Sequence, residues 1–106
     1  MRTSYGVVWR EGEQPLARGK LELLARVLRL EGMAGSEPTT REIRYGDLGE
    51  VRIGRTNAER IDGRPSLVLA PSVGATLSIA SVAQQTGIVA EIAERLTAFV
   101  FSATPR

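Results

Sequence analysis

The chain has 106 residues, contains neither cysteine nor histidine, and carries 14 Lys and Arg side chains against 12 Asp and Glu, a net charge of +2. This length supports a single domain, and the composition excludes disulfides, thiolate zinc sites, cysteine nucleophiles and the commonest general base. No apolar run approaches the ~20 residues of a membrane span or suits a signal peptide, so we expect a cytoplasmic protein without a transmembrane segment.

Apolar and polar residues alternate with a period of two from about residue 5 to residue 80. In the first predicted strand, Tyr5, Val7 and Trp9 share one face and Val8 lies on the other. Such alternation is typical of strands with one buried face. We therefore expect a sheet over most of the chain.

Residues 17–32, ARGKLELLARVLRLEG, contain two such alternations with a short connection around Leu24 and Ala25. Two apolar alternations joined this closely predict an antiparallel hairpin. The connection lacks the Asn-Gly or Asp-Gly pair that fixes a two-residue turn, which leaves the register open by one residue. The next stretch, GMAGSEPTT at 32–40, is predicted to be a loop from its composition.

The second half of the sheet region repeats the alternation in shorter segments. Ile43 and Tyr45 are predicted to point inward from one strand, and Val51 and Ile53 from the next. Asp62-Gly63 favours a turn in the long connection that follows. Together with the first three strands, these segments make about seven, the later ones falling at 41–45, 51–55, 66–70 and 75–81.

The period changes near the C-terminus, where apolar residues recur at helical spacing. A helix is predicted over about 86–100, with 101–106 as a frayed tail. Its start is open, because Thr86 suits an N-cap while Ser81 with Gln84 offers an earlier capping box. The predicted buried stripe consists of Ile88, Ile92, Leu96 and Phe99.

Seven strands with one apolar face must curl up or find a cover, and one amphipathic helix can provide it. We therefore predict a mainly β domain over residues 1–106, a strongly bent antiparallel barrel or sandwich capped by a C-terminal helix. Seven strands followed by a helix resemble the order of pleckstrin-homology-like (PH-like) domains, including GRAM and bacterial types. The resemblance lies in the apolar pattern of two stretches, carried by Gly19, Leu21, Leu23, Arg26, Leu28 and Leu30, and by Ile43, Tyr45, Leu48, Val51 and Ile53.

The resemblance implies a non-catalytic binding or scaffold module without a cofactor. Its partner would be a protein strand laid along an open sheet edge, or another copy of the same chain. The alternative is weak peripheral attachment to anionic lipid through basic loops. We do not expect nucleic acid as a partner, because the charges are mixed in sign and aromatic residues are few. We do not expect an enzyme or a metal site, because the carboxylate pairs have the spacing of ordinary polar turns.

The candidate contact residues are cations and one aromatic side chain. If Lys20, Arg26 and Arg29 met one anionic group they would bind it, but Arg26 and Arg29 are predicted on opposite faces of a strand, where solvent is the simpler environment. The cations of the long connection can contact a partner or form a solvated loop, and Trp9 can anchor an interface or fill the core. The cations of that second group are Arg52, Arg55, Arg60 and Arg64.

Overall fold

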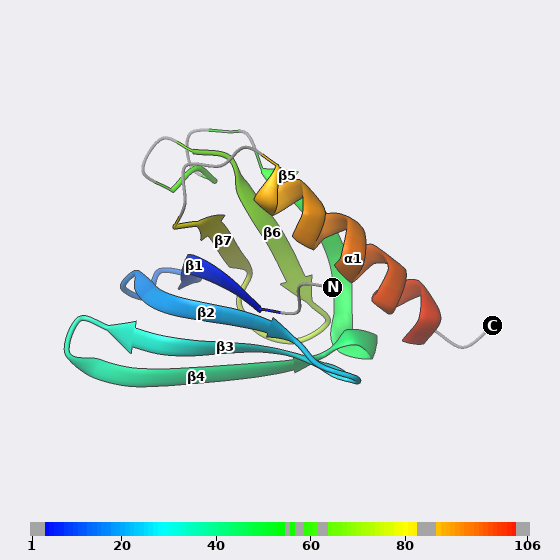
Figure 1. Cartoon of the computed structure of the whole chain (residues 1–106), viewed down its shortest axis with the longest axis horizontal. Helices are drawn as coiled ribbons and strands as arrows, with labels where there is room; N and C mark the ends of the chain where they lie inside the picture. Colours follow the sequence, from blue (N-terminus) through cyan, green and yellow to red (C-terminus); the bar gives the residue numbers. More distant parts are fainter. Residues whose placement is uncertain (1–3, 55, 57–58, 62–63, 83–86, 104–106) are drawn as a thin grey trace.

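Seven antiparallel strands and a C-terminal helix form the computed structural model of this chain (Figure 1), which describes residues 4–54, 56, 59–61, 64–82 and 87–103, with side chains through Phe99. The strands form one sheet in the order β4-β3-β2-β1-β7-β6-β5, which curls into a half-barrel. The predicted fold class, mainly β with a capping helix, is confirmed. The elements are β1 (Ser4–Glu11), β2 (Ala17–Leu23), β3 (Val27–Ala34), β4 (Glu37–Arg44), the 3-10 turn η1 (Tyr45–Asp47), β5 (Leu48–Gly54), β6 (Ser66–Pro71), β7 (Leu77–Ser81) and α1 (Ile88–Ala103).

The β2–β3 hairpin has a single register, which the sequence left open. Leu23 lies opposite Leu28, and the amide of Leu24 donates a hydrogen bond to the carbonyl oxygen of Val27 (2.9 Å). Only two residues therefore turn the chain. This register places the leucines of both strands on the inner face, because a slip by one residue would expose all of them.

The prediction of a loop over residues 32–40 is wrong. β3 continues to Ala34 and β4 begins at Glu37, so only two residues separate the strands. Gly35 has a φ of 64°, a left-handed conformation that two-residue hairpin turns require and that glycine adopts without steric cost. Composition misled the prediction, because threonine favours strands and a proline such as Pro38 is compatible with an edge strand.

Two glycines allow β2 and β3 to approach closely where the sheet bends. Gly19 lies directly opposite Gly32. A Cβ at Gly19 would lie 2.1 Å from the carbonyl oxygen of Glu31, and a Cβ at Gly32 would lie 2.1 Å from that of Arg18. No larger residue fits at either position without moving the backbone, so this pair permits the local bend.

The core fills the inside of the curled sheet, and β1 is covered on both faces. Its inward residues Val7 and Trp9 belong to the main core, whereas Val8 on the other face packs with Ile61 and Ala80. Ile61 belongs to the connection between β5 and β6, and its side chain covers the outer face of β1 and β7 at Val8 and Ala80. The other fully buried large side chains of the core are Leu21, Leu28, Leu30, Leu67, Leu69, Leu77, Ile79, Ile92 and Leu96.

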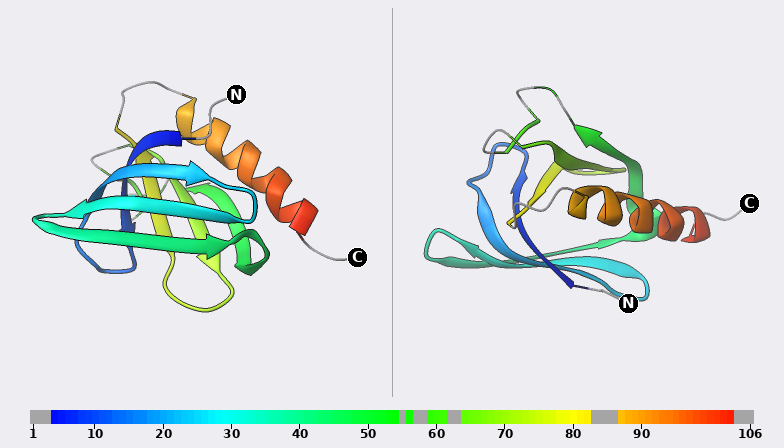
Figure 2. Two further views of the ribbon diagram at one scale, coloured as in Figure 1. Left: turned by 60° about the horizontal axis from the view of Figure 1, so that its bottom comes forward. Right: turned by 45° about the horizontal axis from the view of Figure 1, so that its top comes forward.

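Helix α1 packs against η1, β5, β6 and β7 and covers the open side of the half-barrel (Figure 2). Ile92 and Leu96 are completely buried in the core, as the helical stripe predicted. Near the end of the helix, the ring of Phe99 stacks on that of Tyr45, with the ring centroids 4.8 Å apart and the planes at 8°. The helix therefore closes the core that the sheet leaves open.

The helix begins at Ile88 and ends at Ala103, three residues beyond the predicted end. Residues 88–103 contain neither glycine nor proline, so no residue in this stretch breaks the helix at residue 100. Residues 101–103 therefore belong to the helix and not to a frayed tail. The two predicted capping arrangements depend on Thr86 and Gln84, which lie outside the described residues.

A polar cluster joins α1 to the first strand. The hydroxyl of Tyr5 donates to a carboxylate oxygen of Glu91 (2.6 Å) and accepts a hydrogen bond from the guanidinium of Arg95 (3.1 Å). Glu91 and Arg95 have the spacing of a surface ion pair, and in the structure both meet the same phenol. Burial of the ring, and then the hydrogen bond to Glu91, raise the pKa of Tyr5 above its usual 10.0.

Candidate functional site: the free edge of β4

Strand β4 ends one side of the sheet and pairs with β3 alone. The other terminal strand, β5, lies against α1, whereas β4 lies away from the helix along the lower edge of Figure 1. An eight-residue strand with one unpaired side presents a row of backbone donors and acceptors. This free edge is the candidate site.

The direction of the β4 backbone groups follows from the two ends of the strand. Glu37 lies opposite Ala34 across the two-residue turn, a position at which the two strands exchange hydrogen bonds. Just after the strand, the amide of Tyr45 donates to the carbonyl oxygen of Arg26 before β3 (3.2 Å). Because bonded and non-bonded positions alternate in an antiparallel pair, the odd-numbered residues of β4 bond to β3.

The even-numbered residues of β4 therefore direct their backbone groups to the free edge. Thr40, Glu42 and Arg44 each present an N–H and a C=O there, and Pro38 presents only a C=O because proline has no N–H. The placement of Pro38 at a non-bonded position agrees with this assignment. The side chains of the same residues lie on the outer face of the sheet, where Thr40, Glu42 and Arg44 are exposed.

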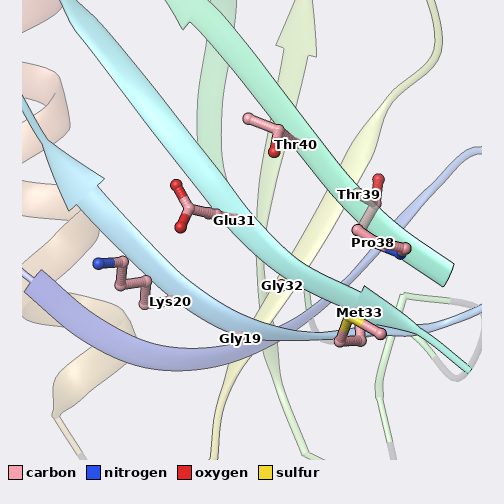
Figure 3. Close-up of a pocket in the computed structure, with 8 residues that line it drawn as sticks. All are labelled: Gly19, Lys20, Glu31, Gly32, Met33, Pro38, Thr39 and Thr40. Carbon is pink, nitrogen blue, oxygen red and sulfur yellow. The ribbon is translucent and has the colours of Figure 1, made fainter. Parts of the chain in front are cut away.

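A shallow hollow of about 600 Å³ lies on the outer surface beside this edge (Figure 3). Bare backbone at Gly19 and Gly32 contributes to its wall, and Met33, whose exposed fraction is 43%, contributes apolar surface. The remaining lining residues are Lys20, Glu31, Pro38, Thr39 and Thr40. The hollow is therefore mixed in character, and β4 forms one of its sides.

Charges of alternating sign cross the outer face and end at the free edge. Glu22 on β2 lies opposite Arg29 on β3, and Arg29 lies opposite Glu42 on β4. The guanidinium of Arg29 is 2.8 Å from a carboxylate oxygen of Glu42, and this hydrogen bond raises the pKa of Arg29. Within the described residues, no carboxylate pairs with the neighbouring edge residue Arg44. The row thus ends in an acidic and a basic side chain, two residues apart, on the free edge.

The structure does not bring the first predicted group of cations into one site. Lys20 is half-exposed, with its ammonium 3.7 Å from a carboxylate oxygen of Glu22 on the same strand. Arg29 is engaged with Glu42. Arg26 lies in the β2–β3 turn and not on a strand face, because β2 ends at Leu23 and β3 begins at Val27. These three cations do not converge on one group.

The second group of cations is also dispersed. The guanidinium of Arg52 on β5 pairs with Glu59 and lies 3.5 Å from a carboxylate oxygen of Glu50. Hydrogen bonds from Arg52 and Thr56 lower the pKa of Glu59 to about 2. Together they tie the connection after β5 to the strand.

The other members of this group lie further along the connection. Arg64 donates a hydrogen bond to the carbonyl oxygen of Ser81 at the end of β7 (3.0 Å). Arg60 is exposed, and Arg55 lies outside the described residues. The described part of the connection is therefore held against the sheet at two places, through Glu59 and through Arg64.

Trp9 is not an exposed anchor, because its exposed fraction is 3% and its ring belongs to the core. Among the described residues, no three acidic side chains gather into a group that could hold a metal ion. None of the described helices is both long and apolar enough to cross a membrane.

Sequence reasoning expected a partner strand along an open sheet edge but did not identify β4 as that edge. It began the fourth strand at residue 41 and so removed Thr40 from it. The available signal was the Gly-Ser pair at residues 35–36, which suits a two-residue hairpin turn, followed by alternation through Thr39, Arg41 and Ile43.

Comparison with known proteins supports the fold and goes no further. No family model and no curated protein matches this chain. A crystal structure of the C-terminal domain of an unknown protein from Leishmania infantum is similar, with a TM-score of 0.65 and 13% sequence identity. The alignment covers 92% of this chain and 81% of that one. At this identity the similarity concerns the arrangement of the elements alone.

Proposed function

We propose that the protein is a non-catalytic binding module of PH-like type that takes up an extended protein strand along the free edge of β4. The single observation that carries the proposal is an eight-residue edge strand whose outward N–H and C=O groups have no other described strand beside them. Adding a strand satisfies these groups and continues the sheet, which is a recurrent mode of peptide recognition. Seven strands followed along the chain by a C-terminal helix is the element order on which the PH-like resemblance rests.

The outer-face side chains define the chemistry of the incoming strand. Residues facing Arg44 and Glu42 should be acidic and basic, and the residue facing Thr40 should be a threonine or another β-branched residue. Beyond Thr40, an apolar side chain would lie against Pro38 and the neighbouring hollow. Attachment to anionic lipid has less support, because the candidate cations are spread over different surfaces and three of them, Lys20, Arg29 and Arg52, pair with carboxylates.

A short synthetic peptide with this pattern tests the proposal by NMR titration. We expect the amide resonances of Thr40, Glu42 and Arg44 to shift and their hydrogen exchange to slow, because these amides acquire acceptors. Thr40→Pro should abolish binding by removing an outward N–H without breaking a bond to β3, whereas Thr40→Val, which keeps the N–H, should bind.

The matched control is the same peptide with alternate backbone nitrogens methylated, which cannot form the hydrogen bonds of a ladder. It should leave the β4 amides unchanged. If the unmodified peptide also causes no shift, the proposal is wrong, and Pro38 and the charges serve only to protect the edge from aggregation.

A further inference from the structure

We infer that the strand received by β4 is β4 of a second copy of this chain, in an antiparallel pair whose two-fold axis passes through Ile43. The inference rests on the proposed use of this edge and specifies its occupant. Its basis is the sequence Glu42-Ile43-Arg44 on the free edge, which is complementary in charge to itself when read in the opposite direction.

The backbone positions restrict how two copies can pair. Because Thr40, Glu42 and Arg44 direct their hydrogen-bonding groups outward, these even-numbered residues must lie opposite even-numbered residues of the second copy. The pair can therefore be centred on any residue of the strand, and each choice sets different side chains face to face.

The charges distinguish among these registers. Centring the pair on Arg41, Glu42 or Arg44 sets each of these residues opposite itself, so that like charges face each other. Centring it on Thr39 sets Glu37 opposite Arg41 of the second copy, but Arg41 already pairs with Glu11 of its own chain (3.2 Å). Centring it on Ile43 sets Glu42 opposite Arg44 of the second copy and Arg44 opposite Glu42 of the second copy. The paired segment is then Glu42–Arg44 of each copy, because β4 ends at Arg44 and η1 follows it. A pair centred on Thr40 brings no charges together across the interface, and it would be insensitive to charge substitutions.

The Ile43 register also continues the charge row of the outer face. In one copy the row runs from Glu22 through Arg29 to Glu42, and Arg44 of the second copy becomes its next member. Arg44, which pairs with no described carboxylate within its own chain, then acquires one. On the inner face the two Ile43 side chains lie beside each other at the axis, where the cores of both copies meet.

Charge-swapped variants test this register through sedimentation velocity and size-exclusion chromatography with light scattering. Wild-type protein should show a concentration-dependent dimer. The first variant, Arg44→Glu, leaves two acidic side chains on the edge, at positions 42 and 44. The second carries both Arg29→Glu and Glu42→Arg, which leaves two basic side chains at positions 42 and 44. This double substitution exchanges the two charges of the β3–β4 ion pair and so keeps the pair. Each variant alone should dimerise at least about tenfold more weakly than wild type, and an equimolar mixture of the two should recover a heterodimer.

Recovery in the mixture cannot arise from misfolded variants, and far-ultraviolet circular dichroism of each variant provides the matched check. A dimer that is unchanged by Arg44→Glu would overturn the Ile43 register. A wild-type protein that stays monomeric would overturn self-association, and the synthetic peptide then separates the two proposals. If the peptide still shifts the Thr40 amide, the edge binds a different strand, and if it does not, the edge has no binding function.

Discussion

At the scale of single residues, burial alters the chemistry of both tyrosine side chains. Tyr5 and Tyr45 are the two tyrosines of the chain, and both are almost completely buried. The phenol of Tyr45 donates to the carbonyl oxygen of Leu24 (2.7 Å), and burial raises its pKa above 10.0. The same cause raises the pKa of Tyr5.

We therefore expect no tyrosine to ionise at its ordinary pH in the folded protein. A raised pKa means that the folded protein favours the protonated phenol over the phenolate. The burial of the two protonated phenols therefore contributes fully to the free energy of unfolding below pH 10, and this contribution is lost as the pH rises through the pKa values of the folded state. Tyrosinate absorbance should appear only above pH 10 and together with unfolding. In concentrated denaturant both tyrosines should titrate near ~10, and a native protein that does the same would contradict the burial of both rings.

At the scale of elements, the bend in the β2–β3 hairpin depends on residues that have no side chain. At Gly19 a Cβ would collide with a backbone carbonyl oxygen and with the Cα of Gly32. Backbone atoms cannot move aside as the end of a flexible side chain can. The hairpin therefore tolerates only glycine here, although nothing in the composition distinguishes Gly19 from glycines in turns.

Gly19→Ala should lower the free energy of unfolding by about 3 kcal/mol or more, since the added carbon forces the two strands apart. Urea unfolding followed by Trp9 fluorescence measures this loss. Gly46→Ala in η1 is the matched control, because nothing lies within 4 Å of a Cβ at that position, and its effect should stay within about 0.5 kcal/mol. Equal stability of the two variants would show that the strands do not approach as closely as described.

At the scale of the whole molecule, the sheet and the helix share one core. Trp9 from the first strand and Leu96 from the last element belong to the same buried cluster, and both are almost fully or fully buried. The Tyr5 hydroxyl, bound to Glu91 and Arg95, adds a polar connection between the two ends of the chain. Neither the curled sheet nor the helix has a complete core alone, so we expect them to unfold together.

Leu96→Ala should cost about 2–5 kcal/mol, because it leaves a cavity between α1 and the sheet. Trp9 fluorescence and far-ultraviolet circular dichroism should report the same lowered urea midpoint, as they should for wild type. Thr97→Ala, at an exposed position on the same helix, should change stability by no more than about 0.5 kcal/mol. A helical signal that disappears before the Trp9 signal would contradict a shared core.

The sequence by itself determined the succession of strands and the final helix and most of the inward-facing residues, although it assigned residues 32–40 to a loop. Alternation through Tyr5, Val7 and Trp9 and the helical spacing of Ile92 and Leu96 predicted what is buried, because these periods are properties of strands and helices wherever they pack. It also predicted that seven half-buried strands need a covering helix. Local patterns of this kind require no knowledge of which segments meet.

Only the tertiary structure decided which strand has a free edge. The free edge of β4 results from the order of strands in the sheet, and the directions of its backbone groups result from a turn at Gly35 that composition concealed. The candidate cations were chosen by type and sequence proximity, but pairing across strands fixed Arg29 to Glu42 and Arg52 to Glu59. Which groups remain unsatisfied depends on long-range pairing, and long-range pairing is the property that local sequence periods do not contain.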